Sequence, residues 1–211
     1  MADDMGNAIG KAADGPVSAL SNDLRIPYSS LREWLEEAEK LGEVKYVQGA
    51  SWERDIGMAA EVVLHDAKAP CVVFEDIPGT LEGSRVLVNF FSGKRMNMTL
   101  GFPSDMTKFE LSEAFRENYM EDIREIPHEF VADGPVMENV IEGDDIDIEK
   151  FPAPMWHEED GGRYIGTGSY NVTRDPDTGW INVGTYRVMI QSRNEVGFFI
   201  SPGKHGRVHR D

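Results

Sequence analysis

The sequence lacks the features of secreted and membrane-spanning proteins. It has one cysteine, Cys71, in 211 residues, so no internal disulfide can form, which fits a reducing compartment. No apolar run approaches the ~20 residues that a membrane span requires. The first ~20 residues lack the apolar stretch of a signal peptide. We therefore expect a soluble cytoplasmic protein with no membrane span.

Basic residues are scarce as well. The chain carries 21 Lys and Arg against 38 Asp and Glu, a formal net charge of −17. Because phosphate contacts need clustered Lys and Arg, this balance argues against a nucleic-acid-binding surface. An acidic surface keeps a protein soluble at high salt. The composition is therefore compatible with a salt-adapted host and equally with an ordinary acidic cytoplasmic protein.

The amino-terminal half alternates helical and extended patterns. Residues 1–28 show little periodicity, and we expect a mobile tail there. A helix over residues 30–41 is predicted from a cap at Ser29 or Ser30, a stop at Gly42, and one apolar face of Leu31, Trp34, Leu35 and Ala38. Further helices are predicted over residues 54–66, 92–100 and 107–119, and extended segments over 43–47, 71–75 and 85–89. The alternation predicts an α/β domain over residues 29–125, with Cys71 as a buried structural thiol.

Beyond residue 125 we expect a second domain, residues 126–211. An acidic stretch with strand candidates at residues 130–131 and 138–141 precedes three β-rich segments, 165–173, 180–192 and 195–201. Tight turns at residues 175–179 and 193–194 join these segments into a meander. A meander must close against other strands, because a long exposed edge is a pairing hazard. We expect an uncovered apolar face that includes Ile190, Phe198 and Ile200.

Three chemically useful side chains lie close together in the β-rich half. Asn182 and Arg187 belong to one short run, and His205 follows between two glycines. A carboxamide and an imidazole are neutral metal ligands, and an arginine binds carboxylates or phosphates. On a regular strand Asn182 and Arg187 would face opposite ways, so both can meet one ligand only if the strand bends, as it could at Gly184. Each residue also has a structural alternative. Asn182 could be an amide at the edge of a turn, Arg187 a surface or ion-paired strand residue, and His205 an exposed loop imidazole.

The ordered motifs around these residues carry a family resemblance. Residues 151–157, 160–168 and 175–179 lead into the 182–187 run, and residues 31–35, 42–44 and 73–79 belong to the same series. The series resembles the UbiD family of reversible decarboxylases, which use prenylated FMN. The resemblance implies an α/β amino-terminal domain followed by the start of a flavin-binding split β-barrel.

The resemblance also implies roles for single residues. It assigns Asn182 and His205 as ligands of a divalent metal, Mn²⁺ or another ion, that anchors the cofactor phosphate. Arg187 is matched to the arginine that orients the substrate carboxylate and pairs with an acidic residue from later in the chain. Cofactor contacts are implied for Asn182, Thr185, Tyr186, Arg187, Phe199, Ile200, Ser201, Lys204 and His205. K⁺ is a further candidate ion, with the backbone carbonyl of Trp180 as ligand, although a packing role for Trp180 is the alternative.

The implied activity is reversible, non-oxidative decarboxylation of an aromatic or α,β-unsaturated carboxylic acid. A flavin prenyltransferase would supply the cofactor, and the complete protein would be a homo-oligomer. Full family members are much longer, and their proton donor and metal-binding glutamate lie later in the sequence. A non-catalytic fragment or accessory subunit that contributes part of a cofactor site is therefore the alternative. An ordinary FMN-binding split-barrel protein would explain the β pattern but not the amino-terminal match.

Overall fold

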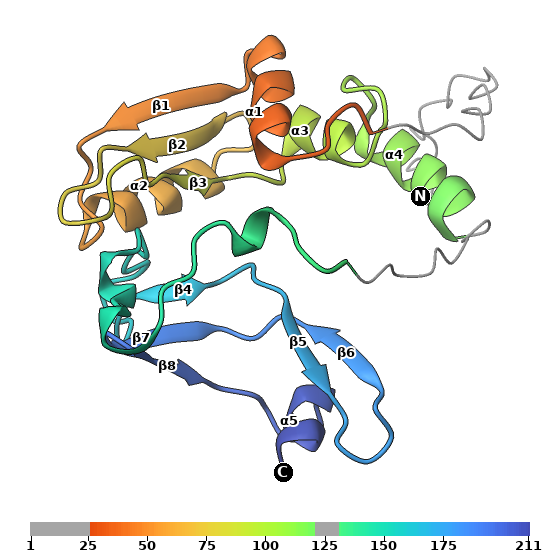
Figure 1. The fold of residues 1–211 in the computed structure, drawn as a ribbon. Helices are drawn as coiled ribbons and strands as arrows, with labels where there is room; N and C mark the ends of the chain where they lie inside the picture. Colours follow the sequence, from red (N-terminus) through yellow and green to blue (C-terminus); the bar gives the residue numbers. More distant parts are fainter. Residues whose placement is uncertain (1–25, 121–130) are drawn as a thin grey trace, which may run out of the picture.

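The computed structural model describes residues 26–120 and 131–211, which form an α/β part and a strand-rich part (Figure 1). The α/β part holds α1 (Leu31–Lys40), β1 (Val44–Gln48), α2 (Asp55–Leu64), β2 (Cys71–Glu75), β3 (Val86–Val88), α3 (Gly93–Thr99) and α4 (Lys108–Phe115), which runs on into a π-helical turn (Arg116–Met120). Every helix and extended segment predicted for this half is present, with ends that shift by a few residues. Residues 1–25 of the predicted tail and the domain boundary near residue 125 lie outside the described residues. The tail prediction is wrong at its end, because Tyr28 packs against the core and its hydroxyl donates to the Thr99 carbonyl at 2.8 Å.

The first helix begins and ends where its sequence predicts. The Ser30 hydroxyl accepts the backbone N–H of Glu33 at 3.3 Å, and the Glu33 carboxylate accepts the backbone N–H of Ser29 at 2.6 Å. Gly42, at φ +70°, ends the helix in the left-handed region that favours glycine. Trp34, Leu35 and Ala38 are buried as predicted, but Leu31 is 55% exposed. Its assignment to the apolar core face was wrong, because Leu31 does not belong to the buried cluster that Trp34, Leu35 and Ala38 form.

Helices pack on both faces of the amino-terminal sheet, whose order is β1-β2-β3. β1 and β2 are parallel, and β3 is antiparallel to β2. Because side chains alternate along β2, Val72 and Phe74 pack with α2, whereas Cys71 and Val73 pack with α1 and α3. Cys71 is fully buried and burial raises the pKa of its thiol, which confirms the prediction of a buried structural thiol.

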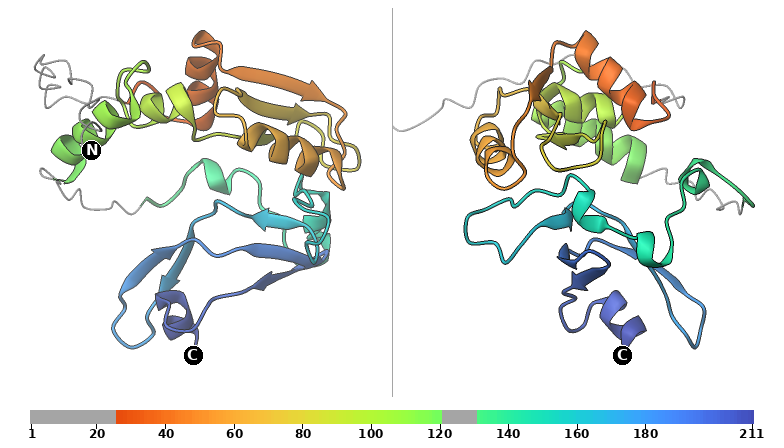
Figure 2. Two further views of the ribbon diagram at one scale, coloured as in Figure 1. Left: turned by 180° about the vertical axis from the view of Figure 1, so that it is seen from behind. Right: turned by 60° about the vertical axis from the view of Figure 1, so that its left-hand side comes forward.

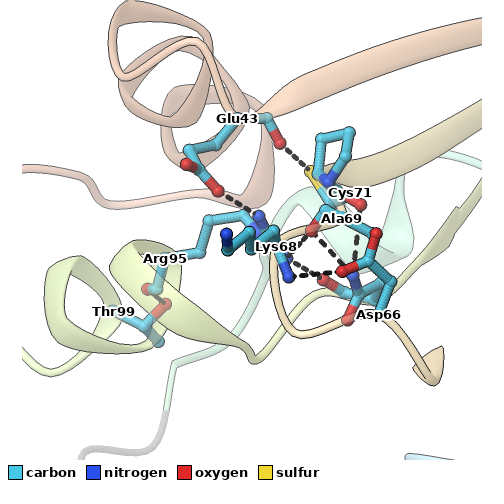
Figure 3. A network of polar contacts seen from close by, with 9 residues as sticks. Glu43, Asp66, Lys68, Ala69, Cys71, Arg95 and Thr99 are labelled. Atoms are coloured by element: carbon cyan, nitrogen blue, oxygen red, sulfur yellow. Dashed lines mark hydrogen bonds and ion pairs between the residues drawn. The ribbon is translucent and has the colours of Figure 1, made fainter. Parts of the chain in front are cut away.

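A buried arginine ties α3 to this sheet (Figure 3). Arg95 is 1% exposed and its Nη1 donates a hydrogen bond to the Glu43 carboxylate. Its Nη2 donates to the carbonyls of Ala69 and Asn89, each at 3.1 Å. The Glu43 carbonyl in turn accepts from the Cys71 thiol at 3.3 Å. The guanidinium therefore connects the start of β1 with the turn before β2.

The strand-rich part is antiparallel and consists of two small sheets. One has the order β4-β7-β8, built from Tyr164–Gly166, Val188–Ser192 and Glu195–Phe198; the other pairs β5 (Asn171–Arg174) with β6 (Ile181–Gly184). The turns at residues 175–179 and 193–194 are present as predicted. The predicted meander of three strands is wrong, because the segments 165–173 and 180–192 each break into two strands. The described residues form no closed barrel; they form a mixed α/β fold.

Two further expectations for this part are corrected. Residues 138–141 are not a strand: a 3₁₀ turn (Pro135–Met137) precedes them, and no ladder partner holds them within the described ranges. The position of Phe130 lies outside those ranges. Ile190 and Ile200 are buried, at 9% and 7% exposure, whereas Phe198 is 49% exposed. Ile190 is covered because β7 packs against the preceding loop, where the Arg163 carbonyl accepts the Ile190 N–H at 2.9 Å.

The two parts meet where α2 rests on the loop before β4 (Figure 2). A Cβ at Gly57 would lie 2.5 Å from the Met155 carbonyl oxygen, so only glycine allows this close approach. The Arg163 guanidinium lies 3.9 Å from the centre of the Trp52 ring. It also donates to three backbone carbonyls of this loop, at Glu149, Phe151 and Ala153. In the ranges 26–120 and 131–211, no helix is long and apolar enough to cross a membrane.

Candidate functional site

The chain bends between β6 and β7, in the middle of the Asn182–Arg187 run. β6 ends at Gly184 and β7 begins at Val188, so residues 185–187 belong to neither strand. The strand does not carry a bulge; it leaves one small sheet and enters the other. Asn182 and Arg187 therefore line one cavity of about 770 Å³, although regular alternation would have turned them apart.

This cavity collects most of the residues that the sequence marked as cofactor contacts. Asn182, Thr185, Tyr186, Arg187, Phe199, Ser201, Lys204 and His205 line it, with Tyr164, Met189 and Phe198 among the others. Ile200, which is buried at 7% exposure, is not among the lining residues. The geometry thus brings the proposed metal ligands, the arginine and several apolar side chains to one opening.

Tyr186 fills a slot between two glycines. A Cβ at Gly184 would lie 2.7 Å from the Tyr186 hydroxyl oxygen, and a Cβ at Gly206 would lie 2.6 Å from it. The hydroxyl accepts the backbone N–H of Gly206 at 3.0 Å. Asn182 Nδ2 lies 3.4 Å from the same oxygen. The spacing of the two glycine motifs therefore reflects the packing of one aromatic ring.

The Asn182 side chain makes hydrogen bonds through its amide nitrogen and none through its amide oxygen among the described residues. Nδ2 donates to the Thr173 hydroxyl at 3.2 Å, in addition to its contact with Tyr186. Among the described residues, no donor reaches Asn182 Oδ1. The oxygen is therefore available for a ligand in the cavity, as the metal assignment requires.

His205 is the first residue of α5 (His205–Arg210), where the sequence suggested a loop. Its ring meets the Trp180 ring edge-on, with 4.7 Å between centroids. His209, one helical turn later, meets the same indole at 5.3 Å. The indole of Trp180 thus packs against both imidazoles, as its packing interpretation predicts.

His209 was not assigned a role from the sequence, yet its side chain is only 3% exposed. Its Nδ1 lies 2.9 Å from the Thr173 hydroxyl, and its Nε2 lies 3.9 Å from the Asp175 carboxylate. The backbone N–H of Thr178 lowers the pKa of Asp175. The four-residue spacing from His205 was the signal available, since it places both rings on one helix face.

Arg187 is oriented by two residues that lie earlier in the chain. Its Nη2 lies 3.6 Å from Asp160 Oδ1, and its guanidinium carbon lies 3.9 Å from the centre of the Tyr164 ring. The Asp160 carboxylate also accepts the His157 backbone N–H at 3.1 Å. Arg187 lines a second cavity as well, of about 350 Å³, which faces Glu61 on α2. Sequence reasoning missed Asp160, although it begins the Asp-Gly-Gly-Arg motif.

The donor set fits the implied metal but does not complete its coordination. Asn182 offers a free amide oxygen and His205 an imidazole at the same opening. Within the part of the chain that the structure describes, no group of three or more His, Cys, Asp or Glu side chains could hold a metal ion. Further ligands would have to come from the cofactor, from water or from other protein residues.

Comparison with known proteins decides the family. Residues 129–211 match the UbiD model, described as the 3-octaprenyl-4-hydroxybenzoate carboxy-lyase Rift-related domain. The phenolic acid decarboxylase of Sedimentibacter hydroxybenzoicus is 32% identical over 178 residues, which cover 81% of this chain and 36% of that protein. This chain belongs to the UbiD family. A second UbiD-type relative, the pyrrole-2-carboxylic acid decarboxylase of Pseudomonas aeruginosa, is 29% identical over 156 residues, 70% of this chain and 31% of that protein.

Solved UbiD structures share the fold. The vanillic acid decarboxylase of Sedimentibacter hydroxybenzoicus in its closed form superposes with a TM-score of 0.71 at 30% identity, over 81% of this chain and 37% of that chain. HmfF from Pelotomaculum thermopropionicum, an evolved dimeric form in complex with prenylated FMN, gives 0.66 at 26% identity, over 86% of this chain and 40% of that chain. The chain spans about a third of the length of these relatives.

Proposed function

We propose that this chain supplies the flavin- and metal-binding part of an enzyme that reversibly decarboxylates an aromatic or α,β-unsaturated carboxylic acid. One observation carries the proposal: Asn182, Arg187 and His205 line the same cavity of about 770 Å³. A complex of a relative with prenylated FMN supports the choice of cofactor. A flavin prenyltransferase would supply that cofactor, and the complete protein would assemble as a homo-oligomer.

The charge and polarity of each lining residue suggest which part of the cofactor site it would contact. Asn182 Oδ1 and the His205 imidazole would hold a divalent metal, Mn²⁺ or a similar ion, against the cofactor phosphate. Lys204 and Ser201 line the same cavity and would add a cation and a hydroxyl for that phosphate. Phe199, 76% exposed, offers an apolar surface for a ring system. A K⁺ ion near Trp180 is part of the same proposal.

Arg187 would bind the substrate carboxylate. Its planar fork matches both oxygens of a carboxylate, and Asp160 and Tyr164 fix its direction before the substrate arrives. When bound, prenylated FMN supplies the electron sink for the loss of carbon dioxide. Holding the carboxylate in one orientation is the contribution that Arg187 makes to this step.

The departing carbon dioxide must be replaced by a proton, and the carboxyl group that the family resemblance implies as its donor is not in this cavity. No Asp or Glu side chain is among the described residues that line it. We therefore assign the proton donor to residues beyond those described. The same gap supports the alternative function, a non-catalytic fragment or accessory subunit that contributes part of a cofactor site.

The test is a decarboxylation assay in which cofactor binding is measured separately. The purified chain is given prenylated flavin, Mn²⁺ and a panel of aromatic and acrylic acids, and flavin retention and carbon dioxide release are recorded. We expect flavin retention without carbon dioxide release from the chain alone, and release from the native protein isolated from its source. Release by the chain alone would refute the assignment of the proton donor. Absence of flavin retention would refute the proposed cofactor site.

A further inference from the structure

The Tyr186 hydroxyl lies next to both candidate metal ligands, Asn182 and His205. The Tyr186 hydroxyl accepts the Gly206 N–H at 3.0 Å, next to His205, and lies 3.4 Å from Asn182 Nδ2. Gly206 and Tyr186 are 20 residues apart in sequence. Asn182 lies on β6, whereas His205 and Gly206 lie on α5. One oxygen atom therefore links the strand that carries Asn182 to the helix that carries His205.

The ring of Tyr186 makes this link rigid. It occupies the space that a Cβ would need at Gly184 and at Gly206, where the nearest approaches would be 2.7 and 2.6 Å. The Asn171 amide nitrogen donates to the backbone carbonyls of Gly184 and Tyr186, at 3.4 and 3.3 Å, which fixes the bend that leads into the ring. Rotation of the phenol is thus restricted by both packing and backbone hydrogen bonds.

A second hydrogen bond fixes the Asn182 amide, and its partner lies on the neighbouring strand β5. Thr173 and Asn182 are paired in register across β5 and β6. The Thr173 hydroxyl accepts from Asn182 Nδ2 at 3.2 Å and lies 2.9 Å from His209 Nδ1. Because two oxygens engage the amide nitrogen, the amide oxygen is the atom left to face the cavity.

We propose that Tyr186 is a positioning residue that sets the distance and orientation between Asn182 and His205, with Thr173 and His209 as its support. This inference rests on the proposed function, and it differs from a cofactor-contact role for Tyr186. Hydrogen-bonding partners that orient ligands typically change metal affinity by about 10–100-fold when they are removed. Tyr186 therefore governs how strongly metal and flavin bind together, whereas flavin binding without metal does not depend on its hydroxyl.

The test measures the coupling between Mn²⁺ and FMN. FMN affinity of the full chain is obtained by fluorescence titration, once with EDTA and once with Mn²⁺, and the ratio of the two affinities is the coupling. In Tyr186→Phe, which keeps the ring but removes the hydroxyl, we expect the coupling to fall about tenfold. The FMN affinity in EDTA stays at the wild-type value, whereas the melting temperature falls by a few degrees because the Gly206 N–H loses its acceptor. Tyr170→Phe is the matched control, because Tyr170 is 82% exposed, and it keeps the wild-type coupling.

A second variant keeps the inference testable if Tyr186→Phe folds poorly. Gly206→Ala retains the phenol but crowds it, and we expect the same loss of coupling. A Tyr186→Phe protein whose FMN affinity falls in EDTA while its coupling persists would show a cofactor contact and overturn the positioning role. Unchanged coupling in both variants, with normal coupling in the wild type, would overturn this inference alone. A wild-type chain that binds FMN without any effect of Mn²⁺ would overturn the metal site itself.

Discussion

Asp160 and Arg187 form an ion pair across the loop that precedes β4, with Asp160 Oδ1 3.6 Å from Arg187 Nη2. The Asp160 side chain is 12% exposed and the Arg187 side chain is 52% exposed. The carboxylate is therefore largely covered, whereas the guanidinium remains accessible to a ligand. The guanidinium carbon also lies 3.9 Å from the centre of the Tyr164 ring. The direction of Arg187 is thus set by residues of the same part of the chain.

The first prediction concerns the shape of this guanidinium. Arg187→Lys keeps the charge but loses the planar fork that binds both carboxylate oxygens. In the native enzyme we expect flavin to remain bound while decarboxylation falls about 100-fold or more, roughly 3 kcal/mol of transition-state stabilisation. Steady-state kinetics on the loaded enzyme check this. Arg174→Lys, an exposed change on β5, is the control, and near-normal turnover of Arg187→Lys would refute the carboxylate-binding role.

The second prediction concerns the metal. His205→Ala removes one of two proposed ligands, so bound manganese and bound flavin are expected to fall together, because the metal bridges protein and phosphate. Metal analysis and flavin absorbance of the purified variant measure both quantities. His65→Ala is the control, since His65 is 75% exposed and paired with Glu61 on α2. Full retention of manganese and flavin in His205→Ala would contradict its assignment as a ligand.

The third prediction tests the buried ion pair of the amino-terminal sheet. Arg95→Met leaves the Glu43 carboxylate without its partner and frees the Asn89 carbonyl. Breaking a buried pair from one side costs about 3–5 kcal/mol of unfolding free energy. Lys40→Met, which breaks the exposed Glu37–Lys40 pair, should cost much less, because solvent screens an exposed pair. Urea denaturation compares the two, and equal losses would contradict a structural role for Arg95.

The fourth prediction is a pH dependence. The Tyr46 hydroxyl donates to the Glu39 carboxylate, and this hydrogen bond raises the pKa of Tyr46 to about 12. The folded protein therefore keeps this proton at pH values where the unfolded chain, with a phenol pKa near ~10, releases it. The stability that Tyr46 contributes is present below about pH 10 and is lost as the pH rises through about 12.

Thermal melts across this alkaline range measure the effect. Tyr46→Phe removes the phenol, so its melting temperature should fall less steeply with pH than that of the wild type. Tyr170→Phe should follow the wild-type slope. A Tyr46→Phe slope equal to that of the wild type would mean that the hydrogen bond to Glu39 does not form in solution.

The amino-terminal fold was predictable because its signals are local. Ser30 and Gly42 mark the ends of α1, and the apolar run at residues 71–74 marks a strand with helices on both faces. The breaks in the β-rich half were not predictable by the same reasoning. Alternation continues through residues 185–187 in the sequence, but the packing of Tyr186 against Gly184 and Gly206 turns the chain there. Contacts between residues far apart in sequence leave no mark in a local pattern.

The candidate site divides in the same way. Asn182, Arg187 and His205 could be proposed from the sequence because their chemistry and spacing are unusual and resemble a known family, and the cavity that they share keeps them candidates. Asp160, Thr173 and His209 were missed because each acts on another residue through a hydrogen bond or an ion pair. The strand candidate at residues 138–141 failed for a related reason: its apolar residues have no ladder partner within the described ranges.

A crystal of the protein grown with FMN and Mn²⁺ tests the central claim most directly, because anomalous scattering locates manganese without reference to the protein model. We expect one anomalous peak at coordination distance from both Asn182 Oδ1 and the His205 imidazole, with the flavin phosphate as a further ligand. Flavin density in the cavity with manganese elsewhere would contradict the metal assignment. Absence of flavin from the cavity lined by Tyr186 and Arg187 would contradict the proposed function as a whole.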